Sequence, residues 1–227
     1  MEELEIIDNW KADNFIDSIP FLKISGNGND FILIDLCKID IPQGIMSSLA
    51  SLMCPRALSV GADGVIFLEK LDDSSMKWYF YNSDGSSADM CGNGSRCAFH
   101  YAFDNQWFPK ATEATLTTLA GVIKGWRLSD GTIRIKMPYY KSYQDNLRFY
   151  ANGSTFVGAV VDTGVPHTII QVDELDSFDV KTYGAIIRDN DTIFPQGSNV
   201  NFIEKVGDNH YIVRTYERGV ENETLAC

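Results

Sequence analysis

The chain carries the same short pattern twice, and this internal repeat is the feature that most constrains its fold. A Gly-Ala-Asp step at residues 61–63 begins thirty residues before Cys91, and a Gly-Ser-Asn step at residues 197–199 begins thirty residues before Cys227. A strand-like apolar run follows each step, GVIFLE in the first half and VNFIEK in the second. A repeat of this kind predicts two lobes of similar topology, each presenting one cysteine.

Hydrophobic periodicity divides the chain into an acidic N-terminal extension, residues 1–20, and two series of strands. A short helix in the extension would pack Trp10, Phe15 and Ile19 onto the body. The pattern predicts an α/β fold of the α+β type, with an N-terminal lobe over 21–138 and a C-terminal lobe over 139–227. Strands are predicted within 21–35, 64–70, 76–82, 112–137, 155–162, 168–173, 199–206 and 209–217, and helices over 42–58, after 91 and near 175–187.

The composition excludes several classes of function. The net charge is −12, whereas contacts with phosphates need clustered Lys and Arg, so nucleic-acid binding is not expected. No apolar run reaches the roughly 20 residues that span a bilayer, and the acidic N-terminus lacks the basic start of a secretory signal. Five cysteines with no CxxC pair and no neighbouring histidines at zinc-site spacing fit reduced thiols in the cytoplasm.

Cys91 begins the segment CGNGSR, which leads into a predicted helix. Glycines at such a point expose backbone N–H groups, and these donors together with the helix dipole form an anion site. The same position lowers the pKa of a thiol from about 8.5 toward neutrality. We therefore expect this Gly-rich loop to bind a carboxylate and to place a reactive thiol beside its α-carbon.

A pair of thiols has a specific chemical use. Inverting an α-carbon needs a base on one face and an acid on the other, and a thiolate with a thiol supplies both, exchanging roles in the reverse direction. Cys227, at the repeat position of Cys91, is the predicted partner. Without pyridoxal phosphate as an electron sink, donors around the carboxylate would stabilise the carbanion. The sequence thus predicts an amino-acid racemase or epimerase that uses no cofactor and no metal.

Simpler structural interpretations apply to the other polar residues. An isolated cysteine is more often a small buried hydrophobe than a catalyst, and this is the prediction for Cys37, Cys54 and Cys97. Cys227 is less distinctive than Cys91 from its local context alone. His167 suits a turn as well as a site, and the Asn-rich segments suit turns.

Together these segments resemble the diaminopimelate epimerase family of bacterial and plant lysine synthesis. The resemblance runs from about residue 21 to the last residue and rests on blocks that keep their order. They are GNGNDFILID at 26–35, GADG at 61–64, YNSDGSSADMCGNGSRC at 81–97, DTGVPH at 162–167, FPQGSNVNF at 194–202 and YERGVENETLAC at 216–227. The resemblance implies interconversion of LL- and meso-diaminopimelate without pyridoxal phosphate, in lysine and peptidoglycan-precursor synthesis, by a cytoplasmic enzyme that often forms a homodimer.

The resemblance also implies a role for individual residues. Cys91 and Cys227 would be the acid/base pair, with His167 and Glu217 tuning the thiols. Arg218 would suit the distal carboxylate of a symmetric diacid. The implied substrate contacts are Asn29, Asn82, Gly92, Asn93, Asn199, Glu217 and Arg218. In each lobe the family fold is a mixed, β-barrel-like sheet wrapped around a central helix.

The chain departs from the family pattern at three places. Val165 stands where many members have Asn, and Gly64 where many have Gln, which puts two substrate contacts in question. The family continues after its second cysteine with Gly-Thr-Gly, a helix and further strands, whereas this chain stops at Cys227. We therefore expect a truncated, incomplete C-terminal lobe, weak stability in the second half and little activity. A fragment of a longer enzyme and a record without its C-terminus are the two explanations.

Two alternatives stay open on the sequence alone. One is a proline or hydroxyproline racemase-like enzyme. Arg218 and the asparagines among the implied substrate contacts argue against it, because they suit an amine with two carboxylates. The other is a fragment that binds amino acids without turning them over.

Overall fold

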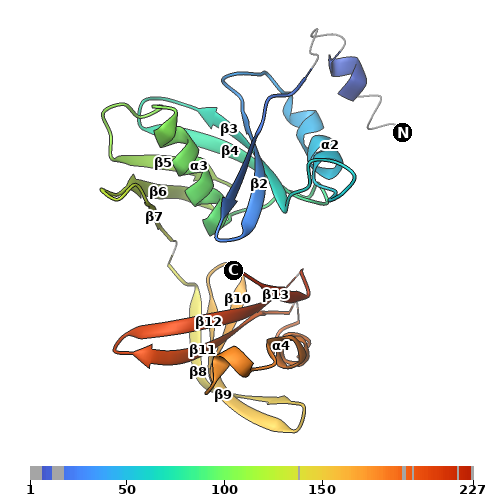
Figure 1. Ribbon diagram of the computed structural model, residues 1–227, viewed down its shortest axis with the longest axis vertical. Helices are drawn as coiled ribbons and strands as arrows, with labels where there is room; N and C mark the ends of the chain where they lie inside the picture. Colours follow the sequence, from blue (N-terminus) through green and yellow to red (C-terminus); the bar gives the residue numbers. More distant parts are fainter. Residues whose placement is uncertain are drawn as a thin grey trace. The chain divides into compact units, whose positions relative to one another are not determined.

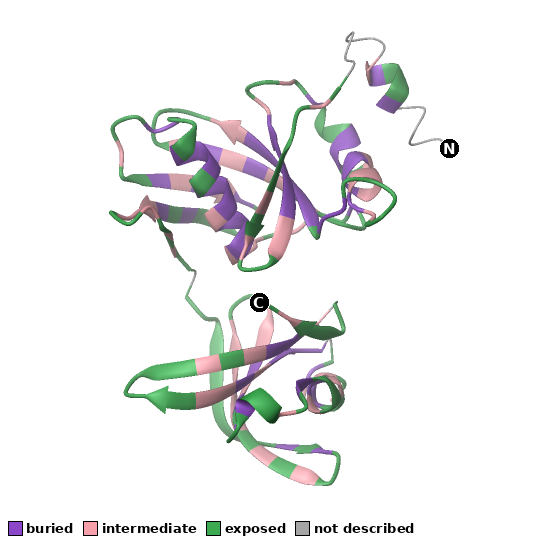
Figure 2. Cartoon of the chain, viewed as in Figure 1, coloured by how far each residue is buried: buried purple, intermediate pink, exposed green. Residues whose placement is uncertain are grey.

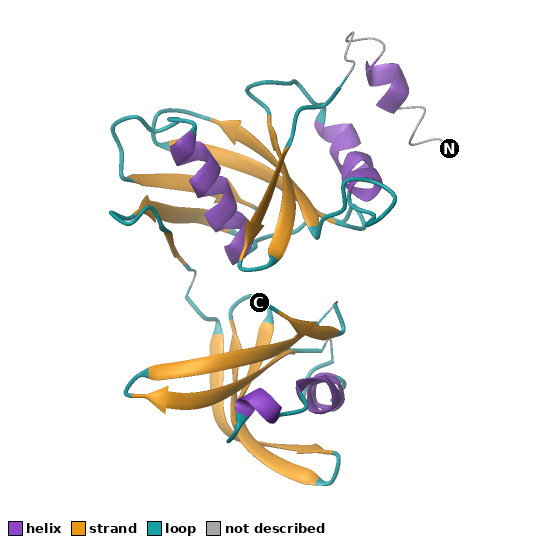
Figure 3. Cartoon of the chain, viewed as in Figure 1, coloured by secondary structure: helices purple, strands orange, loops and turns teal. Residues whose placement is uncertain are grey.

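The computed structural model describes the chain except for residues 1–6, 12–17, 138, 191–192, 196, 219 and 226–227. The chain divides into two compact units, Met1–Met137 and Pro138–Cys227 (Figure 1). Each unit is built on one mixed β-sheet with few helices, an α+β architecture (Figure 3). Within the described residues, no helix combines the length and the apolar character needed to cross a membrane.

The sheet of the first unit has seven strands, ordered as they follow one another in the sequence. Strands β2 and β3 pair in parallel, as do β4 and β5, and the other neighbours are antiparallel. Parallel neighbours need a crossover, and helices α2 (Gln43–Met53) and α3 (Gly92–Asp104) lie in those connections. The strands are β1 (Leu22–Gly26), β2 (Asn29–Asp35), β3 (Gly64–Lys70), β4 (Ser75–Asn82), β5 (Glu113–Thr118), β6 (Gly121–Arg127) and β7 (Ile133–Lys136).

Both faces of strands β2 and β3 are buried, which explains why they are continuous apolar runs rather than alternating ones. Phe31 and Leu33 belong to the core cluster that includes α3, whereas Ile32 and Ile34 belong to the cluster that includes α2. The sheet of this unit therefore carries a helix on each face, and burial is concentrated along its middle strands (Figure 2).

The N-terminal extension contributes to the α2 side of this unit. Residues 7–11 are helical, and Ile7 and Trp10 are buried in the same cluster as α2, with Ile19 packed against it. The predicted packing of Trp10 and Ile19 is confirmed, while Phe15 lies outside the described residues.

The second unit has a six-stranded sheet in the order β13-β12-β11-β10-β9-β8, in which only β10 and β11 are parallel among the described strands. The connection between that pair contains a 3-10 turn, η1 (Leu175–Ser177), and helix α4 (Val180–Arg188). The strands are β8 (Ser142–Ala151), β9 (Ser154–Asp162), β10 (Pro166–Gln171), β11 (Asn199–Gly207), β12 (His210–Glu217) and β13 (Asn222–Thr224).

The predicted internal repeat is visible in the topology. The series β1-β2-α2-β3-β4 and the series β9-β10-α4-β11-β12 share one plan: a hairpin, a helical crossover, a parallel pair and a second hairpin. Gly61 and Gly197 stand shortly before the third strand of each series with φ of +76° and +74°. Glycine adopts this left-handed backbone without steric cost, so the repeated glycine marks the same turn in both units.

Helix α4 covers one face of the second sheet, where Phe149, Ile170 and Phe202 are fully buried. On the opposite face, strand alternation places Val157, Tyr211 and Val213 outward, and each is about half exposed. Among the described residues of this unit, no helix lies on that opposite face (Figure 2). The central helix expected for each lobe is thus seen in the first unit, as α3, but not in the described part of the second.

Three expectations for the elements need correction. The helix predicted over 42–58 ends at Met53, because Pro55 has no N–H to continue the hydrogen-bond ladder. Strand β8 was not predicted, since its sequence SYQDNLRFYA has a weak apolar alternation; the Asn152-Gly153 turn, with φ of +46° and +78°, is the hairpin signal that would have found it. The helix predicted near 175–187 is divided into η1 and α4.

Candidate active site

Cys91 is the N-cap residue of α3. Its backbone is extended, with φ −144° and ψ 120°, and its Sγ accepts a hydrogen bond from the N–H of Gly94 at 3.4 Å. Gly92, Asn93 and Gly94 therefore form the first helical turn rather than the separate loop expected from the sequence. First-turn N–H groups have no acceptor within the helix, and with the positive end of the dipole they favour a thiolate or a bound carboxylate here.

Two glycines let the first turn of α3 lie close against the sheet. A Cβ atom at Gly26 would stand 3.0 Å from the carbonyl oxygen of Asn93 and 3.2 Å from Sγ of Cys97. A Cβ atom at Gly94 would stand 3.4 Å from the side chains of Ile66 and Trp78. Because Gly26 has no side chain, the tip of the β1–β2 hairpin can approach the first turn of α3.

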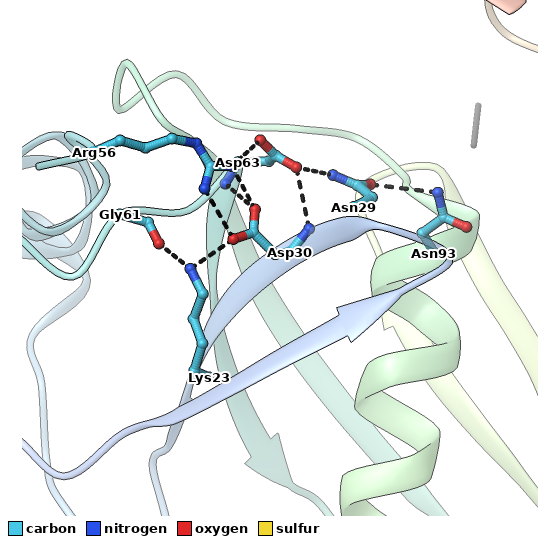
Figure 4. Close-up of polar contacts among 7 residues, drawn as sticks. All are labelled: Lys23, Asn29, Asp30, Arg56, Gly61, Asp63 and Asn93. Atoms are coloured by element: carbon cyan, nitrogen blue, oxygen red, sulfur yellow. Dashed lines mark hydrogen bonds and ion pairs between the residues drawn. The ribbon is translucent and has the colours of Figure 1, made fainter. Parts of the chain in front are cut away.

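Asn29 is the residue that this hairpin brings to Cys91. The two-residue turn Asn27-Gly28 has φ of +55° and +89°, as a tight hairpin requires, and it pairs Gly26 with Asn29. Oδ1 of Asn29 lies 3.6 Å from Sγ of Cys91, which donates. The same oxygen lies 3.4 Å from Nδ2 of Asn93 (Figure 4). Three predicted site residues of the first unit are thus in contact.

Asn82 and Gly64 are placed differently from these. Asn82 ends β4 and donates from Nδ2 to Oγ of Ser86 at 3.0 Å, within the turn that follows the strand. Gly64 is buried opposite Asn82, and a Cβ atom there would meet the carbonyl oxygen of Tyr81 at 2.6 Å. Because β4 passes so closely, this position has no room for a side chain unless β4 shifts.

In the second unit, the parallel pair β10–β11 brings His167 opposite Asn199. Oδ1 of Asn199 accepts the backbone N–H of Arg218 at 2.8 Å, which ties the end of β12 to the start of β11. Nδ2 of Asn201 lies 3.4 Å from Nδ1 of His167. Since an amide nitrogen only donates, this contact assigns the acceptor role to Nδ1 of His167.

Glu217 and Arg218 follow each other at the end of β12, and both are half-buried. Glu217 pairs with Asn222 of β13, and its carbonyl oxygen accepts the N–H of Glu221 at 2.9 Å. The structure therefore gathers His167, Asn199, Glu217 and Arg218 around the ends of β10, β11 and β12. Cys227, the predicted second acid/base group, lies outside the described residues.

Burial lowers the pKa of His167, and the positive charge of Arg218 lowers it further. A histidine that is harder to protonate when folded than when unfolded makes the folded state less stable as pH falls below about 6.5, the ordinary pKa.

We expect His167→Gln to reduce the loss of stability between pH 7.5 and pH 5.5, measured as the shift of the urea midpoint. His210→Gln, at an exposed strand end, is the matched control, and its urea midpoint should fall between pH 7.5 and pH 5.5 as far as that of the unmodified chain. An equal fall in both variants would contradict the prediction.

The remaining described cysteines differ from Cys91. Burial raises the pKa of Cys54 to about 11 and that of Cys97 to about 12, consistent with the structural roles predicted for them. The prediction that Cys37 is a buried hydrophobe is wrong, because Cys37 is exposed in the turn after β2, where its N–H donates to Asp35. The described residues contain no group of three His, Cys, Asp or Glu side chains that could hold a metal ion.

Several polar residues next to these sites were not singled out from the sequence. Asp63 accepts from Nδ2 of Asn29 at 2.7 Å, and Arg56 joins Asp63 to Asp30 (Figure 4). Asn201 joins His167 to Thr215, whose hydroxyl donates to Oδ1 of Asn201 at 2.9 Å. The repeated Gly-small-Asp/Asn step of the sequence marks Asp63 as a residue of interest. Its partners are distant in the sequence, so its contacts could be identified only from the structure.

Comparison with known proteins places these features in a family. The family model described as "Diaminopimelate epimerase" matches residues 21–138 and 159–227. A diaminopimelate epimerase of Hydrogenobaculum sp. (strain Y04AAS1) is 41% identical over 90% of this chain and 77% of its own length, and that of Methanocella arvoryzae is 40% identical over 92% and 78%. Among solved structures, a hydroxyproline epimerase from Agrobacterium vitis is similar in fold, with a TM-score of 0.64 at 14% identity over 88% of this chain and 70% of that one.

Proposed function

Because the chain belongs to the diaminopimelate epimerase family, we propose that it interconverts LL- and meso-diaminopimelate with Cys91 and Cys227 as the acid/base pair. The observation that carries the proposal is the position of Cys91, a half-buried thiol that caps α3 and contacts Asn29. A thiol at a helix N-terminus is stabilised as a thiolate, the form that can remove a proton. The function is that of an isomerase in lysine biosynthesis.

The proposed reaction exchanges one proton for another at the α-carbon. In one direction the thiolate of one cysteine removes the α-proton, and the electron pair stays on the substrate as a carbanion conjugated with the carboxylate. The thiol of the other cysteine then delivers its proton to the opposite face, so the net result is inversion with one thiol and one thiolate exchanged. This scheme requires no electron-sink cofactor, provided that donors around the carboxylate stabilise the developing charge.

We assign the carboxylate next to the reacting carbon to the first turn of α3. The N–H groups of Gly92 and Asn93 stand at the positive end of the helix, which suits an anion. Asn29 and Asn82 are the proposed polar side chains on the same unit. Gly64 and Val165 are left out of the proposed contacts: Gly64 has no side chain, and Val165 has an apolar one.

The second unit is proposed to recognise the distal end of the diacid. A guanidinium binds a carboxylate through two parallel hydrogen bonds, which makes Arg218 the candidate for that group, with Asn199 and Glu217 beside it. The contact between Asn199 and the backbone of Arg218 supports this grouping. His167, whose lowered pKa favours the uncharged imidazole, and Glu217 are the proposed groups that tune the thiols.

Exchange of the substrate α-proton for solvent deuterium tests the proposed function. We expect LL-diaminopimelate incubated with the protein in D2O to give meso-diaminopimelate with deuterium at the inverted carbon. Mass spectrometry and chiral chromatography detect this product even where turnover is slow. L-Proline and hydroxyproline are the control substrates and should show no exchange, because they lack the distal carboxylate. Exchange on proline alone would favour the racemase-like alternative, and binding of diaminopimelate without exchange would favour a non-catalytic binding protein.

A further inference from the structure

Asn29 lies within a series of hydrogen-bonded polar side chains that runs from Arg56 to Arg96, and Figure 4 draws its part from Arg56 to Asn93. Arg56 donates to Asp63, and Asn29 donates from Nδ2 to Oδ2 of Asp63 at 2.7 Å. Asn93 donates from Nδ2 to Oδ1 of Asn29 at 3.4 Å, and Arg96 donates to Oδ1 of Asn93. Sγ of Cys91 is the second donor to Oδ1 of Asn29.

The two ends of this series determine which way each amide points. An ionised carboxylate only accepts hydrogen bonds and a guanidinium only donates them. Asp63 must therefore face Nδ2 of Asn29, which turns Oδ1 of Asn29 toward Cys91. Arg96 must face Oδ1 of Asn93, which turns Nδ2 of Asn93 toward Asn29. Both ends thus require the same orientation of Asn29, so the assignment of its oxygen and nitrogen does not rest on one contact alone.

Ion pairs join Asp63 to its neighbours at this end of the series of side chains. Nη2 of Arg56 lies 2.6 Å from Oδ1 of Asp30 and 2.8 Å from Oδ1 of Asp63, and Nζ of Lys23 lies 2.7 Å from Oδ2 of Asp30. Burial alone would raise the pKa of Asp30, but the hydrogen bonds from Arg56 and Lys23 hold it well below its usual range. Two cations, Lys23 and Arg56, thus accompany the side chains of Asp30 and Asp63.

We propose that Asp63 is a positioning residue for the Cys91 thiol: its carboxylate holds Asn29 with the amide oxygen, not the amide nitrogen, toward Sγ. An amide oxygen accepts the S–H proton and favours the thiol, whereas an amide N–H would favour the thiolate. The helix N-terminus acts in the opposite direction. Asp63 thereby keeps Cys91 poised between the two protonation states that an acid/base group needs at its working pH. This inference deepens the proposed function and rests on it for its catalytic meaning.

The pH dependence of Cys91 alkylation by iodoacetamide, followed peptide by peptide with mass spectrometry, tests the inference without requiring turnover. We expect Asp63→Ala to remove the 2.7 Å contact that orients the amide of Asn29 and to leave the longer 3.4 Å contact with Asn93, so that the amide can turn. The alkylation midpoint of Cys91 should then fall by about 0.5–1 pH unit. Loss of the negative charge of Asp63 would itself lower the midpoint, so the effect is measured again in the Asn29→Ala background. There the shift should be less than half as large, because no amide remains to be turned.

Asp30→Ala is the charge-matched control, since it removes one carboxylate of the same cluster without touching the side chain of Asn29. It should shift the midpoint less than Asp63→Ala does. If Asp63→Ala fails to fold, as judged by circular dichroism, Asp63→Asn replaces it. Arg56 and Asn29 donate to different oxygens of Asp63, and in asparagine one of these positions becomes an NH2 group, which cannot accept.

Equal shifts with Asn29 present and in the Asn29→Ala background, or no shift in a folded variant, would overturn the inference. Absence of deuterium exchange by the unmodified chain would count against the proposed function and leave this result standing.

Discussion

Replacing Cys91 with serine is expected to lower the rate of epimerisation by about 10²–10⁴-fold, the range that a positioned acid/base group contributes. The hydroxyl of serine has no accessible ionisation near neutral pH, so it can neither remove the α-proton nor return one. Serine is also a preferred N-cap residue, and its Oγ can accept the Gly94 N–H that Sγ accepts in the native chain. The variant should therefore lose activity without losing helix α3.

Cys37→Ser is the matched control, because it makes the same chemical change at an exposed thiol in the turn after β2. It should leave both turnover and the thermal unfolding midpoint unchanged. Deuterium exchange and chiral chromatography measure the activity, and circular dichroism measures the fold. Turnover of Cys91→Ser within about tenfold of the unmodified chain would exclude Cys91 from the acid/base pair.

Gly184→Ala is expected to destabilise the second unit by about 1–3 kcal/mol, although alanine is the better helix former by about 1 kcal/mol. Gly184 lies on the buried side of α4, where a Cβ atom would stand 2.4 Å from Cβ and 2.7 Å from Cγ of the Tyr216 side chain. Tyr216 is buried on β12 and cannot move away without displacing its neighbours. The steric cost therefore exceeds the gain in helix propensity.

Gly44→Ala, in the first turn of α2, is the control for the helix-propensity part of this argument. It is exposed, and a Cβ atom there would have no heavy atom within 4 Å. This variant should raise stability by about 0.4–1 kcal/mol. Urea midpoints of both variants test the pair: a stabilised Gly184→Ala variant would show that α4 does not pack on β12 as closely as described.

The conformation of the segment around Cys91 was largely predictable from the sequence because its signals are local. Cys91 followed by two glycines in a helical context indicates a helix N-terminus, and that is where Cys91 lies. The Asn27-Gly28 turn predicts the hairpin that begins β2. The resemblance implied a substrate contact for Asn29, but its contact with Cys91 was not predicted, since nothing in the spacing of two residues so far apart shows that they meet.

The Asp63 cluster could not be found in this way. Lys23, Asp30, Arg56 and Asp63 come from β1, β2, the segment after α2 and the turn before β3, and each alone is an ordinary charged surface residue. Parallel pairing of β2 with β3 brings the turn before β3 beside the start of β2, so that Asp30 and Asp63 exchange hydrogen bonds at 3.1 and 3.2 Å. Only that register gives Asp63 access to the amide of Asn29.

By itself, the sequence determined the two-unit plan, the repeated Gly-small-Asp/Asn step and the exceptional position of Cys91, because each of these depends on residues close together in the chain. The tertiary structure decided which way the amide of Asn29 points, why Gly64 has no room for a side chain and that Cys37 is exposed. These properties depend on strand register and helix packing, which join distant segments. The physical reason is that backbone conformation is set by neighbours in sequence, whereas hydrogen-bond direction and steric room are set by neighbours in space.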